Sequence, residues 1–92
     1  MITRLVKLTI DKEKISEFEK IFKENQEHIL GSKGCNMAEA FQDIHDPSVF
    51  FTHSKWDSEE DLNNYRESEL FQGIWSSTKK TFSSRPEAWS LQ

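Results

Sequence analysis

Apolar and polar side chains alternate near the N-terminus, and the apolar residues then change to a helical spacing. Between residues 2 and 10 the even positions are mostly apolar, as in a strand with one buried face, although Arg4 interrupts the series. Asp11 offers a side-chain oxygen for an N-cap, and the apolar residues after it recur every three or four positions. The pattern predicts a strand followed by a long amphipathic helix. Gly31 and Gly34 bracket the expected end of that helix, where a permissive backbone is needed.

Two further strands are predicted from about Cys35 to Asp43 and from Val49 to Trp56. The turn between them contains Pro47, which presets its own φ angle. Strands joined by so short a connection are normally antiparallel neighbours, so they should form a hairpin. Alternation along the strands predicts a helix-facing set made of Val6, Leu8, Ala38, Ala40, Phe50, Thr52, Ser54 and Trp56.

The last third of the chain carries two helix-capping signals. Ser58 should begin a short helix with acidic residues in its first turn, and Ser68 should begin another whose apolar stripe extends to Phe82. Pro86 ends that helix, and a final strand is expected at about residues 88–91. The order is β-α-β-β-α-β with the second helix split, an α+β ferredoxin-like arrangement in a single domain over residues 1–92.

Composition narrows the possible partners. The 92 residues include seven Phe, three Trp and one Tyr, so aromatic rings supply much of the apolar area available for a core or a pocket. A net charge of −4 with scattered acids leaves no basic patch for nucleic acid. No apolar run is long enough for a membrane span, and no secretory leader is expected, so we predict a cytoplasmic protein.

The predicted strands are apolar on both faces, which indicates self-association. One face should meet the helices, and the other would be a large exposed apolar patch on a monomer. We therefore predict a homodimer in which a second subunit covers this outer face. The residues assigned to it are Leu5, Met37, Phe41, Val49 and Phe51.

Small residues on the helix-facing side leave two interpretations open. Ala38 and Ala40 would leave room for a cavity, with Tyr65, Phe71 and Trp75 as its roof and walls. Alternatively, the alanines let the helices approach the sheet, and the aromatic side chains simply fill the core.

One stretch, from Trp56 to Phe71, joins an aromatic strand to a Trp, an acidic Ser-Glu cap, a short helix and a second Ser cap. This order resembles the antibiotic biosynthesis monooxygenase family of dimeric α+β barrels. The resemblance covers nearly the whole chain and implies a pocket for planar aromatic polyketides or quinols. It also implies that Trp56 contacts substrate, whereas Thr52 stands where one polyketide-oxidising member has Asn. Threonine can still donate one hydrogen bond to a substrate oxygen.

Haem-degrading relatives in this resemblance require an Asn on the first strand, a Trp on the second helix and an axial His on the last helix. The corresponding positions here are Val6, Tyr65 and Trp75. Because the axial imidazole is missing, haem binding is not expected. Tyr65 also replaces a His common in the family, and a phenol is a poor base at neutral pH.

Histidines and cysteine add no clear chemistry. His28 lies near a helix C-terminus, His45 in a turn, and His53 on the outer face, where Glu39 is a possible partner. The lone Cys35 cannot form an internal disulfide, and no zinc-binding spacing is present.

The resemblance implies a cofactor-independent monooxygenase that oxidises a small aromatic phenol or quinol with dioxygen. The alternative is a non-catalytic dimeric module of the same fold that binds a small ligand or has a structural role. No catalytic residue, metal ligand or cofactor site can be assigned. The predicted substrate-binding residues are Val6, Ala40, Thr52, Trp56, Tyr65, Phe71 and Trp75.

Overall fold

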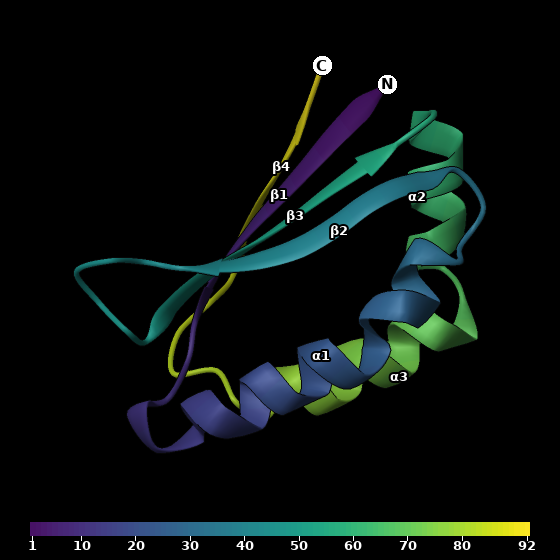
Figure 1. Ribbon diagram of the computed structural model, residues 1–92. Coiled ribbons are helices and arrows are strands. Elements are labelled where there is room, and N and C mark those ends of the chain that lie inside the picture. The colour runs from purple at the N-terminus through teal and green to yellow at the C-terminus, as the bar shows by residue number, and fades with distance from the viewer.

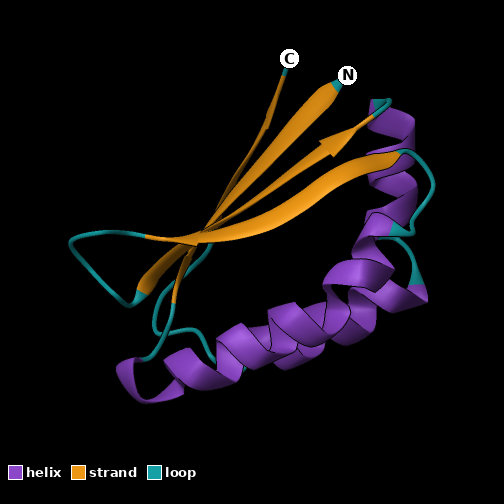
Figure 2. Cartoon of the chain, in the orientation of Figure 1, coloured by secondary structure: helices purple, strands orange, loops and turns teal.

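A four-stranded antiparallel sheet carries helices on one of its faces in the computed structural model, which describes residues 1–92 (Figures 1 and 2). The spatial strand order is β2-β3-β1-β4. The elements are β1 (Ile2–Thr9), a 3₁₀ turn (Lys12–Lys14), α1 (Ile15–Leu30), β2 (Cys35–Gln42), β3 (Val49–Trp56), α2 (Glu59–Arg66), α3 (Glu69–Lys79) and β4 (Glu87–Leu91). This order confirms the predicted ferredoxin-like α+β fold, including the hairpin and the split second helix.

Strand register confirms the predicted assignment of the two faces. Val6 on β1 lies opposite Thr52 on β3, and Thr52 lies opposite Ala40 on β2. The same pairing places Ala88 of β4 next to Val6. Because side chains alternate across a strand, even-numbered residues point toward the helices, except at the start of β2, where a register shift between Cys35 and Met37 places Cys35 opposite Trp56.

The predicted caps are present at the helix starts. The backbone N–H of Asp61 donates to Ser58 Oγ at 3.1 Å, and that of Phe71 donates to Ser68 Oγ at 3.1 Å. Asp11 also caps, but its Oδ1 accepts from Glu13 N at 2.9 Å in the 3₁₀ turn that precedes α1. Each short helix therefore begins where a serine oxygen satisfies an otherwise unpaired N–H group.

One local prediction was wrong. Phe82 lies beyond α3, which ends at Lys79, and pairs with Ile10 in an isolated antiparallel bridge. Backbone contacts with β1 thus replace the last helical turn, because Ser83 N also bonds Thr9 O at 2.9 Å. The two glycines bracket the end of α1 as predicted: Gly31 is its C-cap and keeps right-handed helical angles, and Gly34 has a positive φ, of 82°. The left-handed step that glycine permits occurs once, just before β2.

The best-packed part of the interior, called here the packed end, consists of Leu8, Ile10, Phe18 and Phe50. Their side chains are at most 4% exposed, and the rings of Phe18 and Phe50 lie 4.7 Å apart. Helix α1 packs against β2 and against α3, while α3 packs mainly on α1 and α2 rather than on the sheet (Figure 1). The space between α3 and the strands is therefore bridged by side chains alone.

A helix that crosses a bilayer needs about 20 mostly apolar residues. None of the helices combines the length and the apolar character needed to cross a membrane.

Candidate functional site

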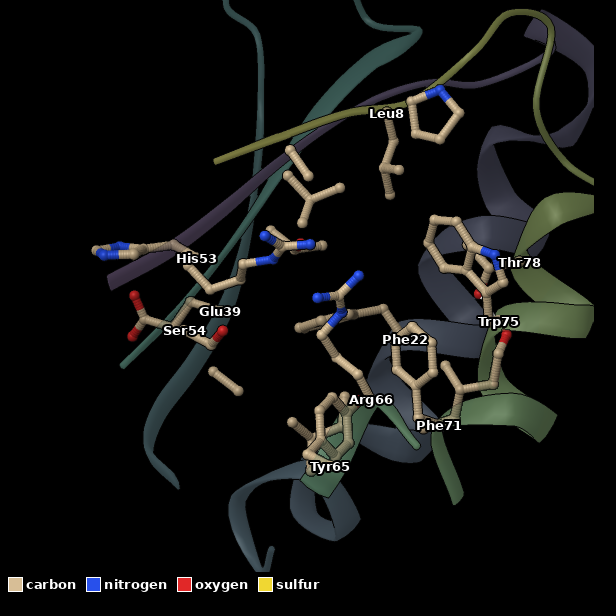
Figure 3. A pocket seen from close by; sticks show the side chains of 18 of the residues that line it. Leu8, Phe22, Glu39, His53, Ser54, Tyr65, Arg66, Phe71, Trp75 and Thr78 are labelled. Carbon is tan, nitrogen blue, oxygen red and sulfur yellow. Dashed lines mark hydrogen bonds between the residues drawn. The ribbon is translucent and has the colours of Figure 1, made fainter. Parts of the chain in front are cut away.

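A cavity of about 360 Å³ lies between the inner face of the sheet and the helices. This volume falls within the range of small-molecule sites, about 300 to 1,000 Å³. Most of its lining residues are hydrophobic. They come from every strand and from all three α-helices, so the cavity is a product of the whole fold (Figure 3).

The floor of the cavity is made by short side chains beside the packed end. Ser54 and Ala38 lie opposite each other across β3 and β2, and Thr52 lies opposite Val6 across β3 and β1. Ala88 extends the floor onto β4. We call this part, with Arg4, the hollow end. Apart from Arg4, its side chains are too short to reach α3, so space remains above them. Farther along the same strands, the larger side chains of Phe50 and Leu8 fill the corresponding space.

Aromatic rings form the opposite wall. Tyr65 of α2 meets Phe71 of α3 edge-on at 5.3 Å, and Phe71 stacks on Trp75 at 5.7 Å. Figure 3 shows Phe71 and Trp75 side by side on one flank of the cavity, with Tyr65 below them in this view. Five of the seven predicted residues thus line one cavity: Val6, Thr52, Tyr65, Phe71 and Trp75.

Trp56 and Ala40 are placed differently from the prediction. Trp56 is fully buried and is not on the cavity lining; its ring stacks on Tyr65 at 4.9 Å, and its Nε1 donates to Ser54 Oγ at 2.9 Å. It holds two lining residues in place rather than facing a ligand, because it ends β3 beneath α2. Ala40 points to the helix side but also lies off the lining.

Tyr65 presents a protonated hydroxyl. Burial, and secondarily the nearby Cys35, raise the pKa of Tyr65 to about 12. At neutral pH the phenol is a hydrogen-bond donor and not a base.

Two arginines on the lining were missed by the sequence analysis. Arg4 lies at an inward position of β1, opposite Ser54 of β3. Arg66 reaches over the cavity from the last turn of α2 (Figure 3). Burial, and then the positive charge of Arg66, lower the pKa of Arg4. The available signal was the position of Arg4 itself, since a charged residue at an inward position of a strand needs a reason to be there.

Two ionisable residues, Glu39 of β2 and His53 of β3, also border the cavity, although their side chains do not enter it (Figure 3). Glu39 and His53 lie opposite each other in register, and Figure 3 shows both side chains directed away from the cavity. The His53 ring lies 6.5 Å from Phe41 on the outer face. No group of three His, Cys, Asp or Glu side chains is arranged to hold a metal ion.

Solved structures with the same fold cover almost the entire chain. A conserved protein from Methanosarcina mazei is 22% identical to this chain, with a TM-score of 0.93; the match covers 100% of this chain and 92% of the Methanosarcina chain. A structure named antibiotic biosynthesis monooxygenase is 17% identical, with a TM-score of 0.92; that match covers 100% of this chain and 97% of the other. At these identities the likeness establishes the fold.

A comparison with curated proteins finds no match. The sequence model of the family described as antibiotic biosynthesis monooxygenase matches residues 1–74, which include β1 through most of α3. The matched region contains Arg4, Thr52, Tyr65 and Phe71, although Trp75 and β4 lie beyond it. The chain belongs to the antibiotic biosynthesis monooxygenase family.

Proposed function

We propose that this chain is a cofactor-independent monooxygenase that oxidises a planar aromatic phenol or quinol with dioxygen. The observation that carries the proposal is the cavity itself, about 360 Å³ between a floor of short side chains and a wall of stacked rings. A flat aromatic body fits such a slot because it can pack face-on against Phe71 and Trp75. Family membership supports the reaction class.

The proposed chemistry balances without an added reductant. The bound phenol loses its hydroxyl proton, and the phenolate passes one electron to dioxygen, giving a phenoxyl radical and superoxide. These combine at a ring carbon, and a proton completes a hydroperoxide. Loss of water from that carbon, with its hydrogen and the outer oxygen, leaves a carbonyl. One oxygen atom enters the product, and the other leaves as water.

The chain's contribution is to orient the ring, donate hydrogen bonds to the ionised oxygen and exclude water. Thr52 and Tyr65 both carry hydroxyl groups on the cavity lining. Because the raised pKa keeps Tyr65 protonated, its hydroxyl can donate to a substrate oxyanion throughout the neutral range.

Dioxygen uptake by purified, metal-free protein tests the proposal. Polycyclic phenols and quinols are supplied one at a time, and product mass is recorded with ¹⁸O-labelled dioxygen. The expected result is uptake with one labelled oxygen in the product. If the compounds bind and no uptake occurs, the chain is instead a binding module of this fold. The lack of an acid-base pair in the cavity would then explain the absence of turnover.

A matched pair of variants locates the reaction. Ala88→Phe places a ring on the cavity floor from the edge strand β4. Because Ala88 is exposed, the larger side chain does not overpack a buried core. Glu87→Phe adds the same ring one position away, on the outer face. Glu87 loses only an exposed ion pair with Lys7 at 3.9 Å. Uptake should fall at least about tenfold in the first variant only.

We also propose that a second copy of the chain covers the outer face of the sheet. Phe41, Trp89 and Leu91 expose 51%, 42% and 47% of their surface there. Together with Leu5 and Phe51 they form an apolar surface spread over all four strands. Light scattering at micromolar concentration should give the mass of a dimer, and Trp89→Glu should shift it toward the monomer.

A further inference from the structure

Arg4 occupies the one inward position of β1 that carries a charge. Its neighbours in register are Ser54 on β3 and Ser90 on β4, both short and polar. One of its five N–H donors bonds Ser90 Oγ at 3.0 Å. The side chain is half-buried and lines the cavity, so the remaining donors face space that a ligand can enter.

Arg66 brings a second guanidinium to the same place from α2. Neither arginine has a carboxylate partner, because the chain's two ion pairs are Lys7 with Glu87 and Lys20 with Glu24. The positive charge of Arg66 contributes to the lowered pKa of Arg4, so the two groups repel each other. Arg4 is half-buried and Arg66 is exposed, so water already solvates the second charge, and an anion beside Arg4 relieves the repulsion between the two groups.

The other groups around the cavity supply no negative charge. The lining residues of α1, α3 and β4 are not ionisable. Glu39 and His53 border the cavity, but their side chains point to the outer face of the sheet (Figure 3). Tyr65 stays protonated at neutral pH. The hollow end is thus positively charged, whereas the chain as a whole has a net charge of −4.

We propose that Arg4 and Arg66 form an oxyanion-binding pair that holds the ionised oxygen of a planar aromatic ligand whose ring packs against Phe71 and Trp75. The guanidinium fork matches a planar oxyanion, and the aromatic wall matches the ring attached to it. The aromatic nature of the ligand rests on the proposed function. The oxyanion is either the reacting phenolate or a carboxylate carried by the ring, and the two require different experiments.

A phenolate held by this pair explains how deprotonation proceeds without a side-chain base. Two nearby positive charges lower the pKa of a bound phenol, so its proton leaves to solvent at neutral pH. The phenolate that remains is the electron donor of the proposed reaction. Arg4 and Arg66 are then catalytic residues because they touch the reacting oxygen.

Calorimetric titration with naphthoate and with its uncharged isostere naphthamide tests the pair at neutral pH. We expect the native protein to bind the anion at least about tenfold more tightly. Arg4→Gln and Arg66→Gln should each bring the two affinities close together. Arg85→Gln is the control, since Arg85 is the third arginine of the chain, is exposed and lies off the lining. Circular dichroism confirms that each variant is folded.

A second titration distinguishes the two sources of the oxyanion. The absorbance of bound naphthol is followed against pH, and its pKa should fall by about one unit or more in the native protein and not in the two variants. A lowered naphthol pKa assigns the pair to the reacting oxygen; an unchanged one, with naphthoate still preferred, assigns it to a substituent carboxylate. Equal binding of naphthoate and naphthamide, no binding of either, or a preference that survives in both arginine variants overturns the proposal. None of these readouts depends on dioxygen uptake, so the pair and the monooxygenase proposal can fail separately.

Discussion

The two ends of the inner sheet face follow the same alternation of side chains, but one end belongs to the core and the other lines the cavity. At the packed end, Leu8 and Phe50 join Phe18 of α1 in one buried cluster, and Leu8 and Phe18 close the cavity on that side. Two residues along the same strands, Val6 and Thr52 belong to the floor of a cavity. The pairing of β1 with β3 continues without a register shift through both ends, so the difference follows the size of the side chains. The fold is stabilised at one end, and that stability permits an unfilled volume at the other.

Phe50→Ala should show the largest effect on stability. Phe50 is 4% exposed and fills the packed end, so its truncation should lower the free energy of unfolding by about 3 to 5 kcal/mol. Thr52→Ala, the next inward position, should cost about 1 kcal/mol or less, because its side chain already borders a cavity. Urea denaturation measures both. Equal losses would show that the hollow end is packed in solution.

Tyr65 should titrate far above an ordinary tyrosine. It is the only tyrosine in the chain, so the ultraviolet absorbance of tyrosinate reports it alone. Burial raises its pKa from 10 to about 12, and at a pH of about 11 the folded protein should remain mostly un-ionised. The unfolded chain loses this proton first, so stability falls as pH rises from about 10 to about 12.

Circular dichroism at each pH checks that the tyrosine titration is of the folded protein. In Tyr65→Phe, the part of the alkaline loss of stability that comes from this group should disappear. A midpoint near 10 in the folded chain would mean that the Tyr65 hydroxyl is solvated, and the aromatic wall would then be open to water.

Trp56→Phe should separate support of the cavity wall from ligand contact. The variant keeps a ring beneath Tyr65 but loses the hydrogen bond from Nε1 to Ser54 Oγ. Unfolding should become easier by about 1 to 2 kcal/mol, while naphthol affinity changes less than about threefold. Trp89→Phe on the outer face is the control. A large loss of affinity in a folded Trp56→Phe protein would return Trp56 to the binding site.

The fold could be predicted because its signals are local. Ser58 and Ser68 mark helix starts, and the alternation of side chains along β1 and β3 assigns the two faces of the sheet without knowledge of the strand register. The end of α3 could not be read in this way, because a bridge between Ile10 and Phe82, distant in sequence, replaces the helical turn. Pro86 is a stop signal, but the helix had already ended at Lys79.

Site residues could be predicted only where alternation along a strand or spacing along a helix was enough to direct a side chain toward the cavity. Val6, Thr52, Tyr65, Phe71 and Trp75 line the cavity. Trp56 points to the same face of the sheet as Thr52. However, α2 packs over the end of β3, so Trp56 is completely buried against Tyr65. Arg66 was missed because the last turn of a helix explains a basic residue without any site. Packing between elements decides both cases, and no local pattern encodes it.

Thr52→Val is the finest probe of the hollow end, because it exchanges a hydroxyl for a methyl group of similar size. The loss of one hydrogen bond to a developing oxyanion should lower turnover about tenfold and leave the stability of the protein within about 0.5 kcal/mol. Thr3→Val makes the same exchange on the outer face, since Thr3 pairs with Lys55 and has outward parity. Initial rates of dioxygen uptake under saturating substrate compare the two variants. A fall in Thr52→Val alone places this hydroxyl at the reacting oxygen. Unchanged rates in both variants make Thr52 a floor residue only, and donation to the oxyanion is then left to the arginines and Tyr65.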